Sequence, residues 1–126
     1  EKSLILVDVE NDFSFKGNSH LFKHVIFNLL KNSLYYVKAA RKGKIIIWVE
    51  KGEGFNKLCF KDTGKGIPKE ILPYIFDQFY SHTKYGAGIG LAFCQMVMRK
   101  IGGDITCDSV MGEFTQFTLT FPVVPN

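Results

Sequence analysis

Apolar residues in the first third of the chain recur three or four positions apart, which is the spacing of one helical face. This period predicts a helix from about Ser19, the expected N-cap, to about Arg41, with Gly43 ending it. The stripe that would be buried consists of Leu21, Phe22, Val25, Ile26, Leu29, Leu30, Ser33, Leu34 and Val37.

The remaining apolar runs are short and rich in β-branched and aromatic residues, which favours strands. Strands are predicted at 4–9, 13–15, 44–50, 57–61, 104–109 and 114–121. A short helix is expected to begin at Pro68 and to be limited by Pro73, and a longer one to run from Leu91 to Ile101. This order predicts an α+β fold, a two-layer sandwich whose mixed sheet is covered on one face by helices.

Composition agrees with a folded chain. The 126 residues, 46% of them hydrophobic, are enough for one core, so residues 1–126 are expected to form a single domain. The net charge of +4 suits a polyanionic ligand, but the lysines are scattered. No basic run could follow a nucleic-acid backbone, so no nucleic-acid partner is expected.

The cysteines and the hydropathy pattern bear on location. Cys59, Cys94 and Cys107 lie far apart within apolar segments, which is typical of reduced core residues in the cytoplasm. No apolar run reaches the ~20 residues that cross a bilayer, so no membrane contact by this domain is expected. Because the chain starts without methionine, its parent protein can still be a membrane protein.

Two asparagines lie within the predicted long helix. Asn28 and Asn32 are four residues apart and therefore share a face, which Tyr36 extends. Asparagine is unfavourable inside helices because its side chain competes for backbone hydrogen bonds. The two amides are either solvent-exposed or offer carbonyl oxygens to a hard cation such as Mg²⁺.

A second motif, Asp62-Thr63-Gly64-Lys65-Gly66-Ile67, follows a predicted strand directly. A carboxylate at a strand end can accept a hydrogen bond from an exocyclic amine, and glycines let the backbone approach a flat ring. The same residues also dominate ordinary turns, so both interpretations stay open here.

A third motif, Gly86-Ala87-Gly88-Ile89-Gly90-Leu91, opens the last predicted helix. Glycine-rich backbone at a helix N-terminus can cradle phosphate. It is neither a Walker A sequence nor a dinucleotide fingerprint, so alone it is weak evidence.

The order and spacing of the three motifs, with Phe76 and Phe79 between the last two, carry more weight. Together they resemble the N box, first glycine box, F box and second glycine box of sensor histidine kinases, over about residues 13–123. The resemblance implies the Bergerat ATP-binding fold, shared with gyrase, Hsp90 and MutL-type ATPases. It also implies that ATP and Mg²⁺ bind.

The resemblance assigns roles to residues. Asn32, with Asn28, would coordinate Mg²⁺, while Asp62 would receive the adenine amine. The nucleotide-binding set that it implies is Asn28, Asn32, Tyr36, Asp62, Gly64, Gly66, Ile67, Phe79, Lys84, Gly86, Gly88, Ile89, Gly90, Leu91 and Thr115. Within it Gly64 and Gly66 shape the adenine pocket, Tyr36 covers the base, and the glycines at 86–90 wrap the triphosphate.

Three features depart from the family pattern. Tyr35 stands where a lysine is common, so a phosphate contact would have to come from elsewhere, such as Lys38 or Lys84. Phe114 replaces a second glycine of the last glycine box, and the lid at 81–85 is very short. These features look like the quorum-sensing kinases that respond to α-hydroxyketones.

The histidines lack the setting of a phosphoacceptor. His20, His24 and His82 are not followed by acidic residues in a dimerisation helix. The resemblance therefore implies that the phosphoacceptor histidine lies on a separate dimerisation domain, absent from this chain. It further implies a response regulator downstream and a parent protein in the bacterial inner membrane.

Three functions remain open for the sequence. The first is the catalytic domain of a histidine kinase, inactive alone. The second is an ATP hydrolase, a class that carries a glutamate as base where this chain has Asn28. The third is a nucleotide-binding module without activity, favoured only by Tyr35 and Phe114.

Overall fold

The computed structural model describes residues 5–7, 15–77 and 87–124, with side chains described for all of these except 5–7 and 87–89. The elements in chain order are β1 (Ile5–Val7), α1 (Ser19–Ala40), β2 (Ile45–Glu50), β3 (Phe55–Asp62), the 3₁₀ helix η1 (Leu72–Tyr74), α2 (Ala87–Lys100), β4 (Asp104–Val110) and β5 (Phe114–Pro122).

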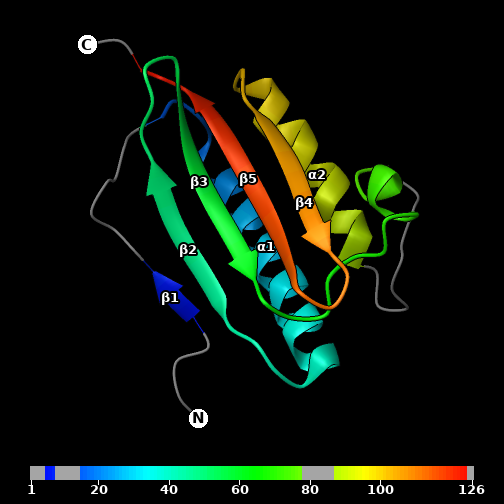
Figure 1. The fold of residues 1–126 in the computed structure, drawn as a ribbon. Coiled ribbons are helices and arrows are strands. Elements are labelled where there is room, and N and C mark those ends of the chain that lie inside the picture. The colour runs from blue at the N-terminus through cyan, green and yellow to red at the C-terminus, as the bar shows by residue number, and fades with distance from the viewer. Residues whose placement is uncertain (1–4, 8–14, 78–86, 125–126) are drawn as a thin grey trace.

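The strands form one mixed sheet in the order β1-β2-β3-β5-β4. β1 runs parallel to β2, whereas all the other pairs are antiparallel. Figure 1 shows α1 and α2 side by side on the same face of this sheet. The predicted α+β fold, a mixed sheet with helices on one face, is therefore confirmed.

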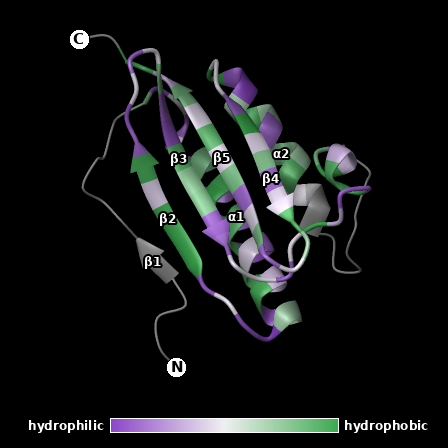
Figure 2. Ribbon diagram, in the orientation of Figure 1, coloured by the Kyte–Doolittle hydropathy of each residue, from purple (hydrophilic) through white to green (hydrophobic). Residues whose placement is uncertain are grey.

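The core lies between the sheet and the two helices. Along β5 every second residue is buried, and the apolar ones among them pack against the helices. Figure 2 shows the hydropathy of the residues along this strand. Phe117, Leu119 and Phe121 of β5 pack in one cluster with Val25 and Leu29 of α1. The apolar face of α1 and the apolar face of β5 therefore contact each other in one core.

The start of α1 differs by one residue from the prediction. The N-cap is Asn18, whose side chain accepts a hydrogen bond from the Leu21 backbone N–H at 3.0 Å, and Ser19 is the first helical residue. Asn18 is the N-cap because its backbone is extended (φ −87°, ψ 114°). This conformation directs its side-chain amide oxygen toward the free N–H groups of the first helical turn. At the other end, Arg41 closes the helix in the left-handed region.

The proline-bearing segment also differs from the prediction. No regular helix begins at Pro68. The Pro68 carbonyl accepts hydrogen bonds from the Ile71 and Leu72 N–H groups in a turn, and this turn leads into η1. Pro73 lies inside η1 rather than limiting it, since the first turn of a helix needs no N–H donor at that position. Of the strand predicted at 13–15, Phe15 lies outside any strand and the rest lies outside the described residues.

The second helix begins earlier than predicted, at Ala87 instead of Leu91. Gly88, Ile89 and Gly90 therefore belong to its first turn. Glycine destabilises a helix by about 1 kcal/mol relative to alanine, and the helix was therefore predicted to begin only after the glycines. Within the described parts of the chain, no helix has both the length and the apolar character to cross a bilayer.

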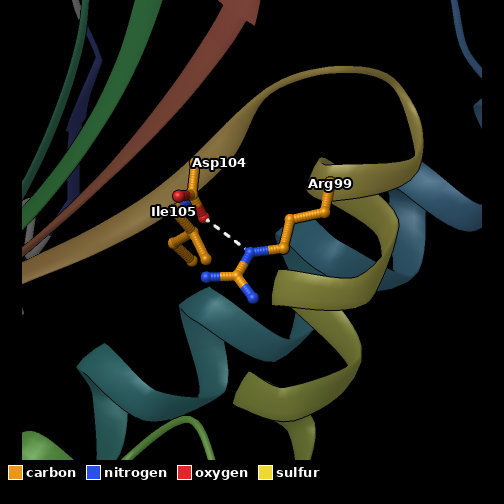
Figure 3. Close-up of polar contacts among 3 residues, drawn as sticks. All are labelled: Arg99, Asp104 and Ile105. Atoms are coloured by element: carbon orange, nitrogen blue, oxygen red, sulfur yellow. Dashed lines mark hydrogen bonds and ion pairs between the residues drawn. The ribbon is translucent and has the colours of Figure 1, made fainter.

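A tight connection joins α2 to β4. Gly102 has φ +85°, and the Gly103 N–H bonds back to the Met98 carbonyl at 2.9 Å, which is the geometry of a glycine cap at a helix C-terminus. Figure 3 shows the exposed Arg99–Asp104 ion pair (3.3 Å) beside this turn. The same Asp104 oxygen accepts from the Ile105 N–H at 2.8 Å, so its structural role is to start β4.

Candidate functional site

A row of polar side chains crosses the end of three strands beneath α1. Asp62, the last residue of β3, pairs with Thr115 of β5, and Thr115 pairs with Ser109 of β4. The hydroxyls of Ser109 and Thr115 are 3.0 Å apart, and Ser109 also donates to the Phe114 carbonyl and accepts from the Ile67 N–H. Both Asp62 and Thr115 are fully buried.

Asp62 is the electrostatic centre of this row. Its Oδ1 accepts a hydrogen bond from the Gly64 N–H at 3.1 Å. Such a bond from an Asp side chain to the backbone two residues on forms a local turn. Among the described residues, neither its Oδ2 nor the nearby Ser33 Oγ completes a hydrogen bond. Burial raises the pKa of Asp62 to about 7, and the Gly64 N–H lowers it only in part; the nearby Ser33 hydroxyl also lowers it, although its geometry falls short of a hydrogen bond.

An unsatisfied buried acceptor is unfavourable by about 1–3 kcal/mol, so a native protein keeps one for a reason. A ligand that brings an N–H donor to Asp62 would remove this cost. The chemistry of the position therefore fits an exocyclic amine, as the sequence predicts.

The amide row of α1 lies against this site. Asn32 and Tyr36 are each 1% exposed and Asn28 is half-buried, so the hypothesis of two exposed amides is wrong for Asn32. The Asn32 side-chain N–H donates to the Asn28 backbone carbonyl at 2.8 Å, which fixes the orientation of the amide. Burial, with smaller effects from Cys107 and Asp62, raises the pKa of the Tyr36 phenol, so it stays neutral.

Two glycines hold the loop after β3 close to its neighbours. A Cβ on Gly64 would lie 2.6 Å from the Tyr36 carbonyl oxygen, and the Lys65 N–H bonds to that oxygen at 3.1 Å. Gly66 has φ +78°, and a Cβ there would lie 2.5 Å from the Val110 carbonyl oxygen. The loop is therefore clamped between α1 and the β4–β5 turn, where larger residues do not fit.

A third glycine joins α2 to the amide row. A Cβ on Gly90 would lie 2.7 Å from Cγ and 2.8 Å from Oδ1 of Asn28. Gly90 needs no special backbone angle, so close approach alone explains the glycine.

Substitution of Gly90 by alanine is expected to push the Asn28 amide aside while leaving adenosine binding near the wild-type value. The affinity for Mg·ATP should fall about ten- to a hundredfold, because one misplaced charge-assisted contact is worth roughly 1.5–3 kcal/mol. Calorimetric titration of both ligands measures the difference. Alanine at Gly54, which has open space around it, is the matched control. Equal affinities for the Gly90 and Gly54 variants would show that the Asn28–Gly90 contact is not needed.

The other predicted site residues are distributed as follows. Ile67 and Leu91 are core residues with at most 1% exposure, and the half-buried Phe76 packs on Phe117 with ring centres 6.4 Å apart. Gly88 and Ile89 lie in the first turn of α2, whereas Phe79, Lys84 and Gly86 lie outside the described residues.

Sequence reasoning missed two residues of the site, Ser33 and Ser109. Ser33 had been placed in the apolar stripe, although a hydroxyl in a buried stripe is itself a polar signal. Ser109 could not be found from a motif, because only the strand register brings it to Thr115.

The donor set bears on which ions the site suits. Asn28 and Asn32 offer amide oxygens but no carboxylate, and Mg²⁺ bound by so few protein groups keeps waters and takes oxygens from phosphate. Within the described ranges, no three His, Cys, Asp or Glu side chains converge into a metal cluster. The residues therefore fit a metal that arrives with a nucleotide.

Comparisons with known proteins agree with this geometry. A family model described as histidine kinase-, DNA gyrase B- and HSP90-like ATPase matches residues 17–125. The autoinducer 1 sensor kinase/phosphatase LuxN of Vibrio harveyi is 49% identical over 116 residues, which is 91% of this chain and 14% of LuxN. The CAI-1 autoinducer sensor kinase/phosphatase CqsS of Vibrio cholerae is 40% identical, over 92% of this chain and 17% of CqsS.

Solved structures show the same fold. The catalytic domain of histidine kinase ThkA superposes with a TM-score of 0.78 at 27% sequence identity. The match covers 96% of this chain and 79% of the ThkA chain. A mycobacterial sensor histidine kinase, MprB, shares the fold at 23% identity with a TM-score of 0.78. This match covers 97% of this chain and 81% of the MprB chain. The predicted resemblance to quorum-sensing kinases is confirmed at the level of these autoinducer-sensor relatives, of which the chain spans less than a fifth.

Proposed function

Because the chain belongs to the histidine kinase-, DNA gyrase B- and HSP90-like ATPase family, we propose that it binds Mg·ATP and delivers the γ-phosphate to a histidine on a separate dimerisation domain. The observation that carries this proposal is the buried Asp62, whose Oδ2 has no hydrogen-bond partner among the described residues. Such an acceptor, at the end of β3 and next to the amide row, suits the adenine amine.

The neighbouring residues supply the rest of a nucleotide site. Gly64 and Gly66 hold the loop close enough for a flat ring to lie against backbone, and the neutral Tyr36 borders Asp62. Asn28 and Asn32 would hold Mg²⁺ together with phosphate oxygens, and the ion would neutralise charge on the phosphates. The glycines at the start of α2 provide free N–H groups for the same phosphates.

Kinase activity is favoured over hydrolysis by Asn28. A hydrolase needs a base that takes a proton from water, and an amide cannot do this at neutral pH. In the proposed transfer, an imidazole nitrogen forms the new bond to the γ-phosphorus as the bond to the β–γ bridging oxygen breaks, and ADP leaves. The domain contributes positioning and charge neutralisation, while the partner domain supplies the nucleophile and takes its proton.

The remaining expectations concern the parent protein. We expect the dimerisation domain to belong to the same protein, a response regulator to receive the phosphoryl group, and the parent to lie in the bacterial inner membrane with this domain in the cytoplasm. The names of LuxN and CqsS favour an autoinducer as the signal. This chain spans 14% of LuxN and 17% of CqsS, so the signal is inferred from those names and from no residue of this chain.

The assignment of the metal ligands is tested by Asn32→Ala. Adenosine affinity should stay near wild type, while Mg·ATP affinity should fall about tenfold or more, since only the metal bridge is removed. Titrations with adenosine, ADP and ATP, each with and without Mg²⁺, separate the two contributions. Asn56→Ala, at a buried asparagine at the opposite end of β3, is the control. Equal losses for adenosine and Mg·ATP would mean that Asn32 is structural.

A further inference from the structure

Two exposed histidines form a pair at the start of α1, on the same helix face as the amide row that follows. His20 and His24 are four residues apart, so their side chains stack on one face of the helix. Their ring centroids are 5.1 Å apart at an interplanar angle of 83°, and both residues are exposed. Neither is needed by the nucleotide site proposed above.

The separation of the rings matches that of two imidazoles on one metal ion. With a zinc–nitrogen bond of about 2.0–2.1 Å, roughly 1.1 Å from nitrogen to ring centre and a tetrahedral angle, the two centroids lie about 5 Å apart. The backbone of α1 therefore already provides the spacing, and only rotation of the rings is needed to direct both nitrogens at one point.

The surroundings restrict the pair and leave room for further ligands. The half-buried Phe93 of α2 packs edge-on against His24, with centroids 6.3 Å apart, and limits the positions of that ring. An open hollow of about 380 Å³ lies beside the pair, lined by His20, Leu21, His24, Asn28 and Phe93. Water or a small exogenous ligand can fill the remaining coordination positions from this hollow.

We propose that His20 and His24 form a binding site for a borderline transition-metal ion such as Zn²⁺ or Cu²⁺. Imidazole nitrogens select such ions, whereas Mg²⁺ requires oxygen ligands, so this site is chemically distinct from the Asn28–Asn32 pair. Since no third His, Cys, Asp or Glu joins the pair in the part of the chain that is described, the ion keeps open positions. The proposal does not depend on the proposed function.

The test is a titration of the purified 126-residue chain with Zn²⁺ against a competing metal indicator, with thermal unfolding as a second readout. One saturable site per chain is expected, and each of His20→Asn and His24→Asn should weaken it at least tenfold. The melting temperature should rise with Zn²⁺ in the wild type and not in either variant, since a ligand that binds only the folded chain stabilises it.

A matched control keeps the result specific. Lys23→Asn alters an exposed neighbour on α1, so this variant should bind Zn²⁺ as the wild type does. Because His20 and His24 are exposed, their variants are expected to fold normally. Absence of saturable binding, or binding that survives both substitutions, would overturn the proposal.

Discussion

Replacing Asp62 by asparagine is expected to weaken nucleotide binding strongly and at the same time to stabilise the nucleotide-free domain. A carboxylate only accepts hydrogen bonds, whereas an amide can turn a donor toward the donor of the ligand. Loss of a hydrogen bond to a charged group costs on the order of 1.5–3 kcal/mol, so affinity should fall about ten- to a hundredfold. Titration with ADP measures this loss.

The gain in stability follows from the raised pKa of Asp62, about 7 against a usual value of 3.8. Between those pH values the folded chain holds a proton that the unfolded chain has released, so the free energy of unfolding falls as pH rises and reaches its low level above about pH 7. The full shift corresponds to about 4 kcal/mol. Asparagine should recover roughly 2 kcal/mol at pH 8, because its own polar atoms must also be buried.

Denaturant unfolding at pH 5 and pH 8 measures this effect, and the variant should gain much more at pH 8. The control is Asp108→Asn, the same substitution on the exposed side of β4 one residue before Ser109. The wild type should also bind adenosine about tenfold more tightly at pH 8 than at pH 6, as the carboxylate becomes ionised. Binding by the Asp62 variant within a factor of two of wild type would refute the adenine assignment.

The isolated domain is expected to bind ATP without hydrolysing it appreciably and without phosphorylating itself. Asn28 cannot activate water, and an in-line attack on the γ-phosphate requires a nucleophile that another domain presents. Addition of the helical dimerisation domain in trans should restore transfer to its histidine. The measurement is incubation with γ-labelled ATP, first with the pure chain and then with the added domain.

The outcomes of this experiment separate the candidate functions. Rapid phosphate release by the lone domain would favour the hydrolase, and label on His20, His24 or His82 would show that the acceptor lies within this chain. ATP binding with no transfer, even to the added domain, would favour the module without activity. Asp62→Asn in the same assay, at limiting ATP, should lower transfer about ten- to a hundredfold if transfer runs through the proposed pocket.

Hydrophobic periodicity predicted most of the fold. Each helix and strand packs one face against the same core, so its apolar residues recur with the period of that element. The strands 44–50, 104–109 and 114–121 agree with β2, β4 and β5 to within a residue or so. Errors arose where local chemistry decides the boundary. Asn18 and Ser19 are both good caps, and only the backbone angles at Asn18 distinguish them.

The site was predictable as motifs but not as an arrangement. Asn32 and Asp62 stand out in the sequence because each is a polar residue in an apolar or strand-end context. The row from Asp62 through Thr115 to Ser109 depends on strand register, which no local pattern encodes. The need for glycine at position 90 likewise appears only when Asn28 of the other helix lies beside it.

The pairing of β3 with β5 has a consequence for how the domain is made. β2 with β3, and β4 with β5, are hairpins of neighbouring segments, but Asp62 meets Thr115 only across β3 and β5, which lie far apart in the chain. Contacts of this kind form late in folding, because a long loop must first be closed. A nascent chain that has left the ribosome only as far as α2 has both asparagines and Asp62, yet the pocket still lacks its β5 wall. If the proposed nucleotide site is right, binding by a newly made chain requires β5 to be paired with β3 and would report that the whole sheet is assembled.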